Sequence, residues 1–137
     1  MPQTASQSTI SLISRLSKSV HRRTPESELG MKLRDYIALS YIADHDGLSQ
    51  QQLGETLGID ANNLVLLLNE LEEAGFARRV REPTDRRRHI VEITDAGRAA
   101  FERGQRARDS VEDEVLAALD PDERATLRAL LAKALDG

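Results

Sequence analysis

Apolar residues recur at helical spacing over most of the chain, and this pattern predicts a mainly helical fold. After a frayed tail over residues 1–9, the first predicted helix ends near His21 and has its apolar positions at Ile10, Ile13, Leu16 and Val20. The Pro, Ser and Gly content of TPESELG, residues 24–30, predicts a linker. A second helix is expected over 32–44, with an apolar face made of Leu33, Tyr36, Ile37, Ser40 and Tyr41.

Two further helices separated by a short glycine turn are expected next. Ser49 and Gln52 have capping-box spacing at the start of the first helix, which should stop at Gly58. Asp60 suits the N-cap of the second helix, which should run through Ala74. This spacing is typical of a helix-turn-helix, although a plain helical hairpin has the same pattern.

A β-hairpin is predicted directly after these helices. FARRVRE (76–82) and RHIVEI (88–93) are strand-like, and the intervening PTDR contains the Pro and Asp that favour a turn. Val91 and Ile93 are expected to hold this hairpin to the body of the domain. The sequence therefore predicts a mainly α fold with a small β-hairpin wing, that is, a winged helix-turn-helix.

The C-terminal part predicts two more helices. The first should begin at Thr94 as N-cap and run to about Leu119, with a stripe of Ala96, Ala100, Ala107, Val111, Val115 and Leu119. Asp120, Pro121 and Glu123 then suit the start of another helix. Its apolar positions are Leu127, Leu130, Leu131 and Ala134.

A winged helix closes its own core with about 65 residues, so the outer helices have apolar faces without a partner in that domain. A two-fold interface between two copies would bury them, which predicts a homodimer. A monomer with a helical cap folded back on the domain is the alternative.

Charge is distributed unevenly along the chain. The formal net charge is −4, but residues 78–89 contain six Arg against Glu82 and Asp85. A basic cluster of this kind suits an anion such as nucleic acid, although a solvated hairpin would have the same composition. The wing residues predicted to contact DNA are Arg79, Arg81, Asp85, Arg86, Arg87 and Arg88.

The stretch DRRRHIVEITDAGRA, which follows LEEAGFARRV, resembles the wing signature of the bacterial MarR (multiple antibiotic resistance regulator) family. The matching residues are Leu71, Glu72, Gly75, Asp85, Arg87, Thr94 and Gly97. The resemblance implies a homodimeric repressor or activator of transcription that binds double-stranded DNA and responds to a small aromatic or phenolic ligand. It also implies a ligand pocket near Arg15, Tyr36 and Tyr41.

The resulting division is a tail and dimerisation helix over 1–30, the DNA-binding domain over 31–94 and dimerisation helices over 95–137. The second helix of the helix-turn-helix should direct Leu64, Leu67, Leu68 and Leu71 inward. Its outward residues are Asn62, Asn63, Leu66, Asn69, Glu70 and Glu73. The first helix should contact DNA through Ser49, Gln50 and Gln51.

The outward face departs from the family pattern, which commonly has Thr near Val65 and Arg near Leu66. Asn groups can read adenine and Leu66 can touch a thymine methyl, but a guanine-reading Arg is missing. Leu66 can equally be a plain exposed leucine or a protein contact. A winged-helix adaptor that binds protein rather than an operator is therefore the alternative function.

Other classes of function are disfavoured by the sequence. The chain has no Cys, and His21, His45 and His89 are scattered, so no metal site, cofactor or catalytic group is expected. The acidic and imidazole cluster DHD, residues 44–46, lies at a helix end and is expected to be solvated. Because no signal-peptide or membrane-spanning pattern is present, the expected location is cytoplasmic.

Overall fold

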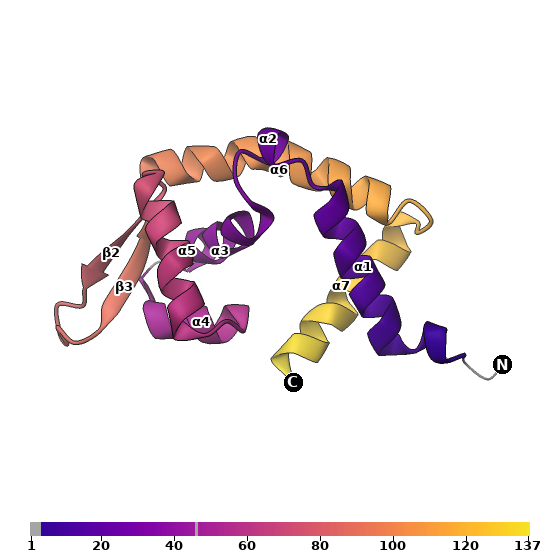
Figure 1. The fold of residues 1–137 in the computed structure, drawn as a ribbon, viewed down its shortest axis with the longest axis horizontal. Coiled ribbons are helices and arrows are strands. Elements are labelled where there is room, and N and C mark those ends of the chain that lie inside the picture. Colours follow the sequence, from indigo (N-terminus) through magenta and orange to yellow (C-terminus); the bar gives the residue numbers. More distant parts are fainter. Residues whose placement is uncertain (1–3, 46) are drawn as a thin grey trace. The chain divides into compact units, whose positions relative to one another are not determined.

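The computed structural model describes residues 4–45 and 47–137, and the chain divides into two compact units. The winged unit contains residues 25–107, and the terminal unit combines the residues up to 24 with those from 108 onward. Figure 1 shows the elements of both. The functional boundaries expected after residues 30 and 94 stay predictions, because a compact unit need not coincide with a functional one.

The winged unit contains four complete helices, three strands and the first part of α6. In chain order they are α2 (Glu26–Leu29), α3 (Leu33–Asp44), β1 (Leu48–Ser49), α4 (Gln50–Leu57), α5 (Ala61–Glu73), β2 (Ala77–Arg81), β3 (His89–Ile93) and α6 (Asp95–Val115). The strands form an antiparallel sheet in the order β1-β3-β2, with Val91 opposite both Leu48 and Arg79. The hairpin prediction is confirmed, while β1 was not expected, because a two-residue strand leaves no alternating pattern.

The main core of the winged unit lies between α3, α4, α5 and the sheet. It consists of Ala38, Ile42, Leu53, Leu64, Leu67, Leu68, Leu71, Ala77 and Val91. The inward direction predicted for the four leucines of α5 is confirmed. The face predicted for α3 is partly wrong, since Ile37 is 40% exposed whereas Ala38, Leu39 and Ile42 are buried. Two clusters pack against α3, so its buried arc is wider than a single stripe.

The second cluster explains why TPESELG is not a plain linker. Leu29 from α2 is buried beside Tyr36 and Ala107, with Phe101 packed against them. The rings of Tyr36 and Phe101 stack with centroids 5.4 Å apart. Pro and Ser correctly indicated a break between longer helices, but the burial of Leu29 stabilises one helical turn within it.

The caps predicted for the helix-turn-helix are confirmed. Ser49 Oγ accepts from the backbone N–H of Gln52 at 3.1 Å, and Gln52 Oε1 accepts from the backbone N–H of Ser49 at 3.2 Å. Gly58 has φ +67°, which ends α4 in the left-handed region. Asp60 Oδ1 accepts from the backbone N–H of Asn63 at 2.8 Å and starts α5.

The start of α6 lies against the root of the hairpin. Thr94 Oγ1 donates to the carbonyl of Gly75 at 2.5 Å and accepts from the backbone N–H of Gly97 at 3.0 Å, so its predicted N-cap role is confirmed. A Cβ at Gly97 would lie 1.9 Å from the carbonyl oxygen of Phe76. Only glycine permits this approach, which explains the glycine three residues after Thr94.

The terminal unit contains η1 (Ala5–Gln7), α1 (Thr9–Arg23), the second part of α6 and α7 (Pro121–Asp136). Asp120 and Glu123 form the predicted capping box of α7. The frayed-tail prediction is wrong for Ala5–Gln7, which form a 3₁₀ turn, and residues 1–3 lie outside the described residues. Helix α6 ends at Val115 rather than near Leu119, because residues 116–118 turn toward α7.

Within residues 4–45 and 47–137, no helix is both long and apolar enough to cross a membrane. The same residues contain no group of three His, Cys, Asp or Glu side chains able to hold a metal ion. Asp46 of the DHD cluster lies outside the described residues.

Candidate nucleic-acid interface

One face of α5 is buried by leucines and the opposite face is open to solvent. Asn62, Leu66 and Asn69 lie about one turn apart along the open face, and Leu66 is 56% exposed. An exposed row of two amides around an apolar side chain offers hydrogen bonds and a methyl contact to one surface. Their contacts with DNA remain a prediction.

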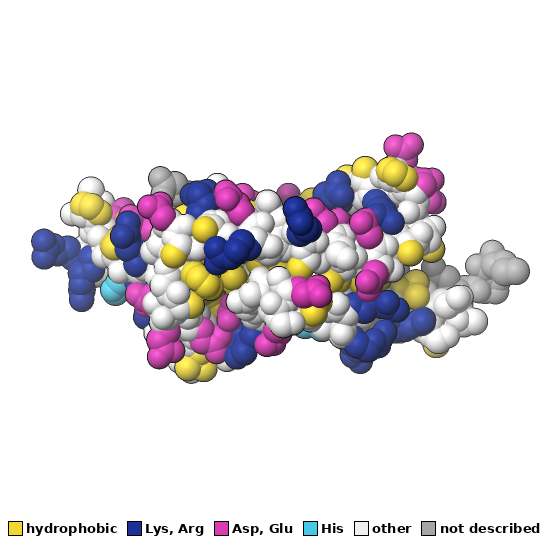
Figure 2. Space-filling model, turned by 90° about the horizontal axis from the view of Figure 1, so that it is seen from above, with side chains coloured by type: hydrophobic (Ala, Val, Ile, Leu, Met, Phe, Trp, Pro, Cys, Tyr) yellow, Lys and Arg dark blue, Asp and Glu magenta, His cyan; other side chains and the backbone are white. Residues whose placement is uncertain are grey.

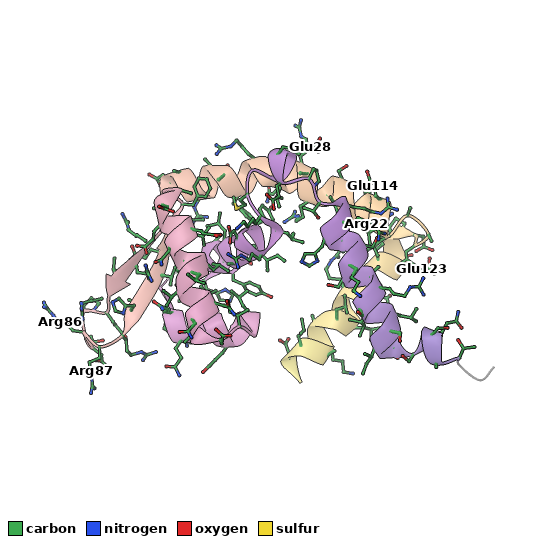
Figure 3. The ribbon with its side chains drawn as sticks, in the orientation of Figure 1. Arg22, Glu28, Arg86, Arg87, Glu114 and Glu123 are labelled. Atoms are coloured by element: carbon green, nitrogen blue, oxygen red, sulfur yellow. The ribbon has the colours of Figure 1, made fainter. Side chains whose placement is uncertain are left out.

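The tip of the hairpin presents arginines to solvent. Asp85 shapes this tip, because its Oδ1 accepts from the backbone N–H of Arg87 at 3.1 Å and from Arg87 Nε at 3.3 Å. The Arg87 side chain is nonetheless 93% exposed. Figure 3 shows Arg86 and Arg87 directed away from the body of the hairpin, and Figure 2 shows dark blue side chains projecting at this end.

Three other wing arginines, Arg78, Arg81 and Arg88, have partners within the hairpin. Arg78 Nε lies 3.0 Å from Glu92 Oε2, and Arg81 Nη1 donates to the carbonyl of Arg86 at 2.8 Å. Arg88 Nε lies 3.7 Å from Glu82 Oε2. These contacts stiffen the wing and reduce its free positive charge. Arg78 and Arg81 nonetheless stay exposed, so the positive surface of the wing extends from its strands to Arg86 and Arg87 at the tip.

Arg79 differs from the remaining wing arginines because it contacts α5. Its Nε donates to Glu72 Oε1 at 2.6 Å and its Nη2 donates to Asn69 Oδ1 at 2.6 Å. Only 23% of its side chain is exposed. Arg79 thus lies at the root of the wing rather than at its tip. The prediction from sequence had placed it with the tip arginines among the residues that contact DNA. Strand and helix periodicity contained no signal for this cross-element contact.

A shallow depression of about 300 Å³ joins the three elements that carry the predicted DNA contacts. Its lining residues are Ser49, Gln50, Gln51, Ala61, Leu64, Arg87, Arg88 and His89. The start of α4, the start of α5 and the wing residues from Arg87 to His89 therefore meet around one concave surface. The first turn of a helix has unpaired N–H groups, so such a surface with two arginines suits an anion. His89, which appeared isolated in the sequence, also belongs to it.

A charged cluster ties α5 to α3. Lys32 Nζ and Arg34 Nη2 each lie 3.1 Å from a carboxylate oxygen of Glu70, and Arg34 Nε lies 3.4 Å from Asp35 Oδ1. Glu70 was expected to face outward, but it is half-buried against these groups. Because Glu70 is far in sequence from Lys32 and Arg34, no local pattern revealed the cluster.

The two carboxyl groups of this cluster titrate differently. Burial raises the pKa of Asp35 to about 6, and its hydrogen bond with Glu70 adds to this effect. Hydrogen bonds from Asp35, Lys32 and Arg34 lower the pKa of Glu70 to about 2. Burial and the neighbouring carboxylate thus favour protonation of Asp35, whereas the nearby cations favour ionisation of Glu70. The cluster is therefore a structural tie beneath the recognition face and lies outside the concave surface.

The residues expected to line a ligand pocket occupy different surroundings. Tyr36 is buried against Phe101, and its hydroxyl donates to the carbonyl of Phe101 at 3.4 Å. Tyr41 packs against the main core instead. Arg15 is exposed on α1 in the terminal unit. Their grouping into one pocket stays a prediction.

An exposed polar helix following a capped helix and a glycine turn, with a basic hairpin beside it, defines a winged helix-turn-helix protein. The MarR family matches residues 29–88. The transcriptional regulator HosA of Escherichia coli O111:H- is 30% identical over 101 residues, which are 74% of this chain and 75% of HosA. The chain therefore belongs to the MarR family of transcription regulators.

Two further comparisons agree with this assignment. The uncharacterized HTH-type transcriptional regulator YdgJ of Bacillus subtilis is 32% identical over 99 residues, covering 72% of this chain but only 59% of YdgJ. The structure of the transcriptional repressor CouR bound to a 23-mer DNA duplex is 27% identical, with a TM-score of 0.84 over 98% of each chain. The similarity to CouR includes both the winged unit and the terminal helices.

Proposed function

We propose that this protein is a sequence-specific transcription regulator, acting as a repressor, that binds double-stranded DNA as a homodimer on a pseudo-palindromic operator. One observation carries the proposal: the start of α4, the start of α5 and the wing residues Arg87 and Arg88 line a single concave surface. The exposed face of α5 begins at Asn62, next to the lining residue Ala61. An α-helix fits the major groove of B-DNA, and flanking cations and helix starts suit phosphates on either side.

The assignment of roles follows from exposure and charge. Asn62, Asn63, Leu66 and Asn69 on α5 face the base edges, while Arg86 and Arg87 reach the backbone or the minor groove. Backbone N–H groups around Ser49, Gln50 and Gln51 meet a phosphate. The similar protein CouR is a transcriptional repressor whose structure contains a DNA duplex. This similarity supports a DNA duplex as the partner of this chain and repression as its effect on transcription.

The homodimer is supported by the terminal unit. Its helices expose large apolar side chains at Ile10, Leu12, Ile13, Leu130, Leu131 and Leu135. An exposed apolar set on two helices of one chain is typical of a surface that pairs with its own copy about a two-fold axis. Two winged units related in this way would read two half-sites about one helical turn apart, roughly 10 base pairs.

A small aromatic or phenolic effector is proposed on the family resemblance. Binding to the dimer should raise its melting temperature and lower its affinity for the operator, because the ligand favours a state that fits DNA less well. A thermal-shift screen of phenols and aromatic carboxylates, followed by operator titration with each hit, tests this part separately. If hits stabilise the protein but leave operator affinity unchanged, they do not act as effectors.

The experiment that tests DNA binding is a titration of a duplex library at several salt concentrations. Release of counterions makes log K fall linearly with log salt, with a slope of about −0.9 per neutralised phosphate. We expect several phosphate contacts per dimer and hence a steep slope. Weak binding that is insensitive to salt would instead favour the protein-adaptor alternative, for which the exposed Leu66 would be a protein contact.

A further inference from the structure

The contact between Arg79 and Asn69 connects the root of the wing to the open face of α5. Arg79 Nη2 donates to Asn69 Oδ1 at 2.6 Å, while its Nε donates to Glu72 Oε1 at 2.6 Å. Asn69 and Glu72 are three residues apart and so lie on the same side of the helix. One planar guanidinium therefore bridges two side chains of the recognition helix.

Glu72 holds the guanidinium in this position. Its other oxygen, Oε2, accepts from the backbone N–H of Arg79 at 3.4 Å, so one carboxylate contacts both the backbone and the side chain of the same residue. The pair is partly buried, with 23% of the Arg79 side chain and 33% of the Glu72 side chain exposed. The positive charge of Arg79 is thus matched locally, and the side chain has little freedom to reach a phosphate.

The bond to Asn69 determines which way the amide is turned. Arginine has only donors, so the amide atom that faces Arg79 must be the acceptor Oδ1. The amide nitrogen Nδ2 then lies on the other side of the group, away from Arg79. Asn69 accordingly offers its N–H donors to a base, while its oxygen is already engaged.

We propose that Arg79 is a positioning residue that sets base specificity by holding Asn69 as a hydrogen-bond donor toward DNA. This inference rests on the proposed operator binding and makes it more specific. In the major groove, guanine presents two acceptors, adenine and thymine present one each, and cytosine presents only its N4 donor. The base opposite Asn69 is therefore guanine in preference to adenine or thymine, and cytosine is disfavoured.

The test is a binding-site selection on random duplexes with the wild-type protein and three variants. Asn69→Asp keeps the shape of the side chain but replaces the donor with an acceptor. Arg79→Ala frees the amide to turn over. Arg78→Ala is the matched control, because it removes the same charge from the neighbouring position of β2, where Arg78 pairs with Glu92.

At one symmetric pair of positions, wild type should disfavour cytosine by about fivefold, as expected for one hydrogen bond of about 1 kcal/mol. Asn69→Asp should reverse this preference toward cytosine or adenine, whose amino groups donate. Arg79→Ala should flatten it toward equal use of the four bases and leave the other positions unchanged. Arg78→Ala should keep the wild-type preference at every position.

A second measurement separates positioning from phosphate binding. Because Glu72 already matches its charge, Arg79→Ala should leave the salt slope of binding unchanged, whereas loss of a phosphate contact lowers it by about one unit per wing. If Asn69→Asp and Arg79→Ala keep the wild-type preference at every position, the inference is wrong while operator binding stands. The same holds if Arg79→Ala lowers the salt slope by about one unit per wing. If wild type enriches no sequence, the proposed function fails and the inference fails with it.

Discussion

The two units of the chain use the same helical periodicity with different results. In the winged unit, the large side chains of Leu29, Leu39, Ile42, Leu53, Leu68, Leu71 and Val91 are fully buried. Among the described residues of the terminal unit, Val111 alone is buried, and six Ile and Leu side chains of α1 and α7 are exposed. The winged unit completes a core within one chain, whereas the terminal unit leaves its apolar stripes open, and the proposed homodimer would cover them.

The difference arises from what lies opposite each apolar stripe. Leu64, Leu67, Leu68 and Leu71 of α5 meet α3, α4 and the sheet, which close around them. Within the terminal unit, ion pairs such as Arg124 to Asp113 at 2.7 Å tie α7 to α6, but the stripe that contains Leu131 stays open. Helical spacing therefore predicts where a stripe lies, and the tertiary structure decides what covers it.

The largest expected effect comes from charging the open stripe of α7. The double change Leu131→Glu and Leu135→Glu places four carboxylates in a two-fold interface, because each change occurs twice. At about 3 kcal/mol or more per interface, the dimer dissociation constant should rise at least about 100-fold. Light scattering across a dilution series measures this, while circular dichroism should show that the helices remain folded.

Ala129→Glu is the matched control for this experiment, because helical geometry places Ala129 on the side of α7 opposite the stripe. It should leave the dimer intact. Equal dissociation by both changes, or a dimer that tolerates the double change, would contradict an interface built on this stripe and would support a terminal unit that is complete in one chain.

The next effect concerns the exposed face of the winged unit. Replacing Leu66 with Arg, the residue common in similar proteins, provides two donors for guanine. Such a bidentate contact contributes roughly 1 to 3 kcal/mol of discrimination. Binding-site selection with Leu66→Arg should therefore shift one symmetric pair of positions from T or A toward G. Unchanged preferences in a folded variant would mean that this face does not read DNA, and would favour the adaptor function.

A smaller effect is expected at the wing tip. Arg87→Ala should weaken specific and non-specific duplexes alike by about fivefold per wing, as for a contact of about 1 kcal/mol, and lower the salt slope by about one unit per wing. Asp85→Ala should also weaken binding, although it removes a negative charge, because Asp85 orients Arg87. Arg106→Ala, an exposed arginine on α6, controls for net charge. Tighter binding by Asp85→Ala would contradict the orienting role.

The last prediction concerns the carboxyl pair beneath α5, Asp35 and Glu70, and the quantity it changes is the free energy of unfolding. Because the pKa of Asp35 is raised to about 6, its protonation stabilises the folded state fully at low pH, and this contribution is lost as pH rises through 6. Asp35→Asn should therefore make the free energy of unfolding less dependent on pH between 4 and 7, and the variant should gain relative to wild type as pH rises. Denaturant titrations at several pH values measure this.

The pKa of Glu70 is lowered to about 2, so its contribution is present above its ordinary pKa and is lost only as pH falls toward 2. Its contribution begins to fall below about pH 5, at the low end of the window used for Asp35→Asn, and is constant over the rest of that window. Asp44→Asn, at the exposed end of the same helix, serves as the control. A constant difference between Asp35→Asn and wild type from pH 4 to 7 would show that Asp35 titrates normally.

Local sequence signals predicted much of the fold. Caps at Ser49, Asp60 and Asp120 located helix starts correctly, since these side chains bond within three residues of their own position. Contacts between distant elements were not predictable in this way. The pairing of Arg79 with Asn69, the burial of Glu70 against Lys32 and the stacking of Tyr36 on Phe101 depend on how elements pack. The exposed row of α5 was predicted correctly, whereas the specific role of each wing arginine required the structure.

The most direct test of the account is binding-site selection by the wild-type protein on random duplexes at physiological salt. The enriched sequences should form an inverted repeat whose half-site centres lie about one helical turn, roughly 10 base pairs, apart, because a two-fold dimer presents two copies of α5. A single motif without a repeat would contradict the dimer, and the absence of any enriched sequence would contradict operator binding itself.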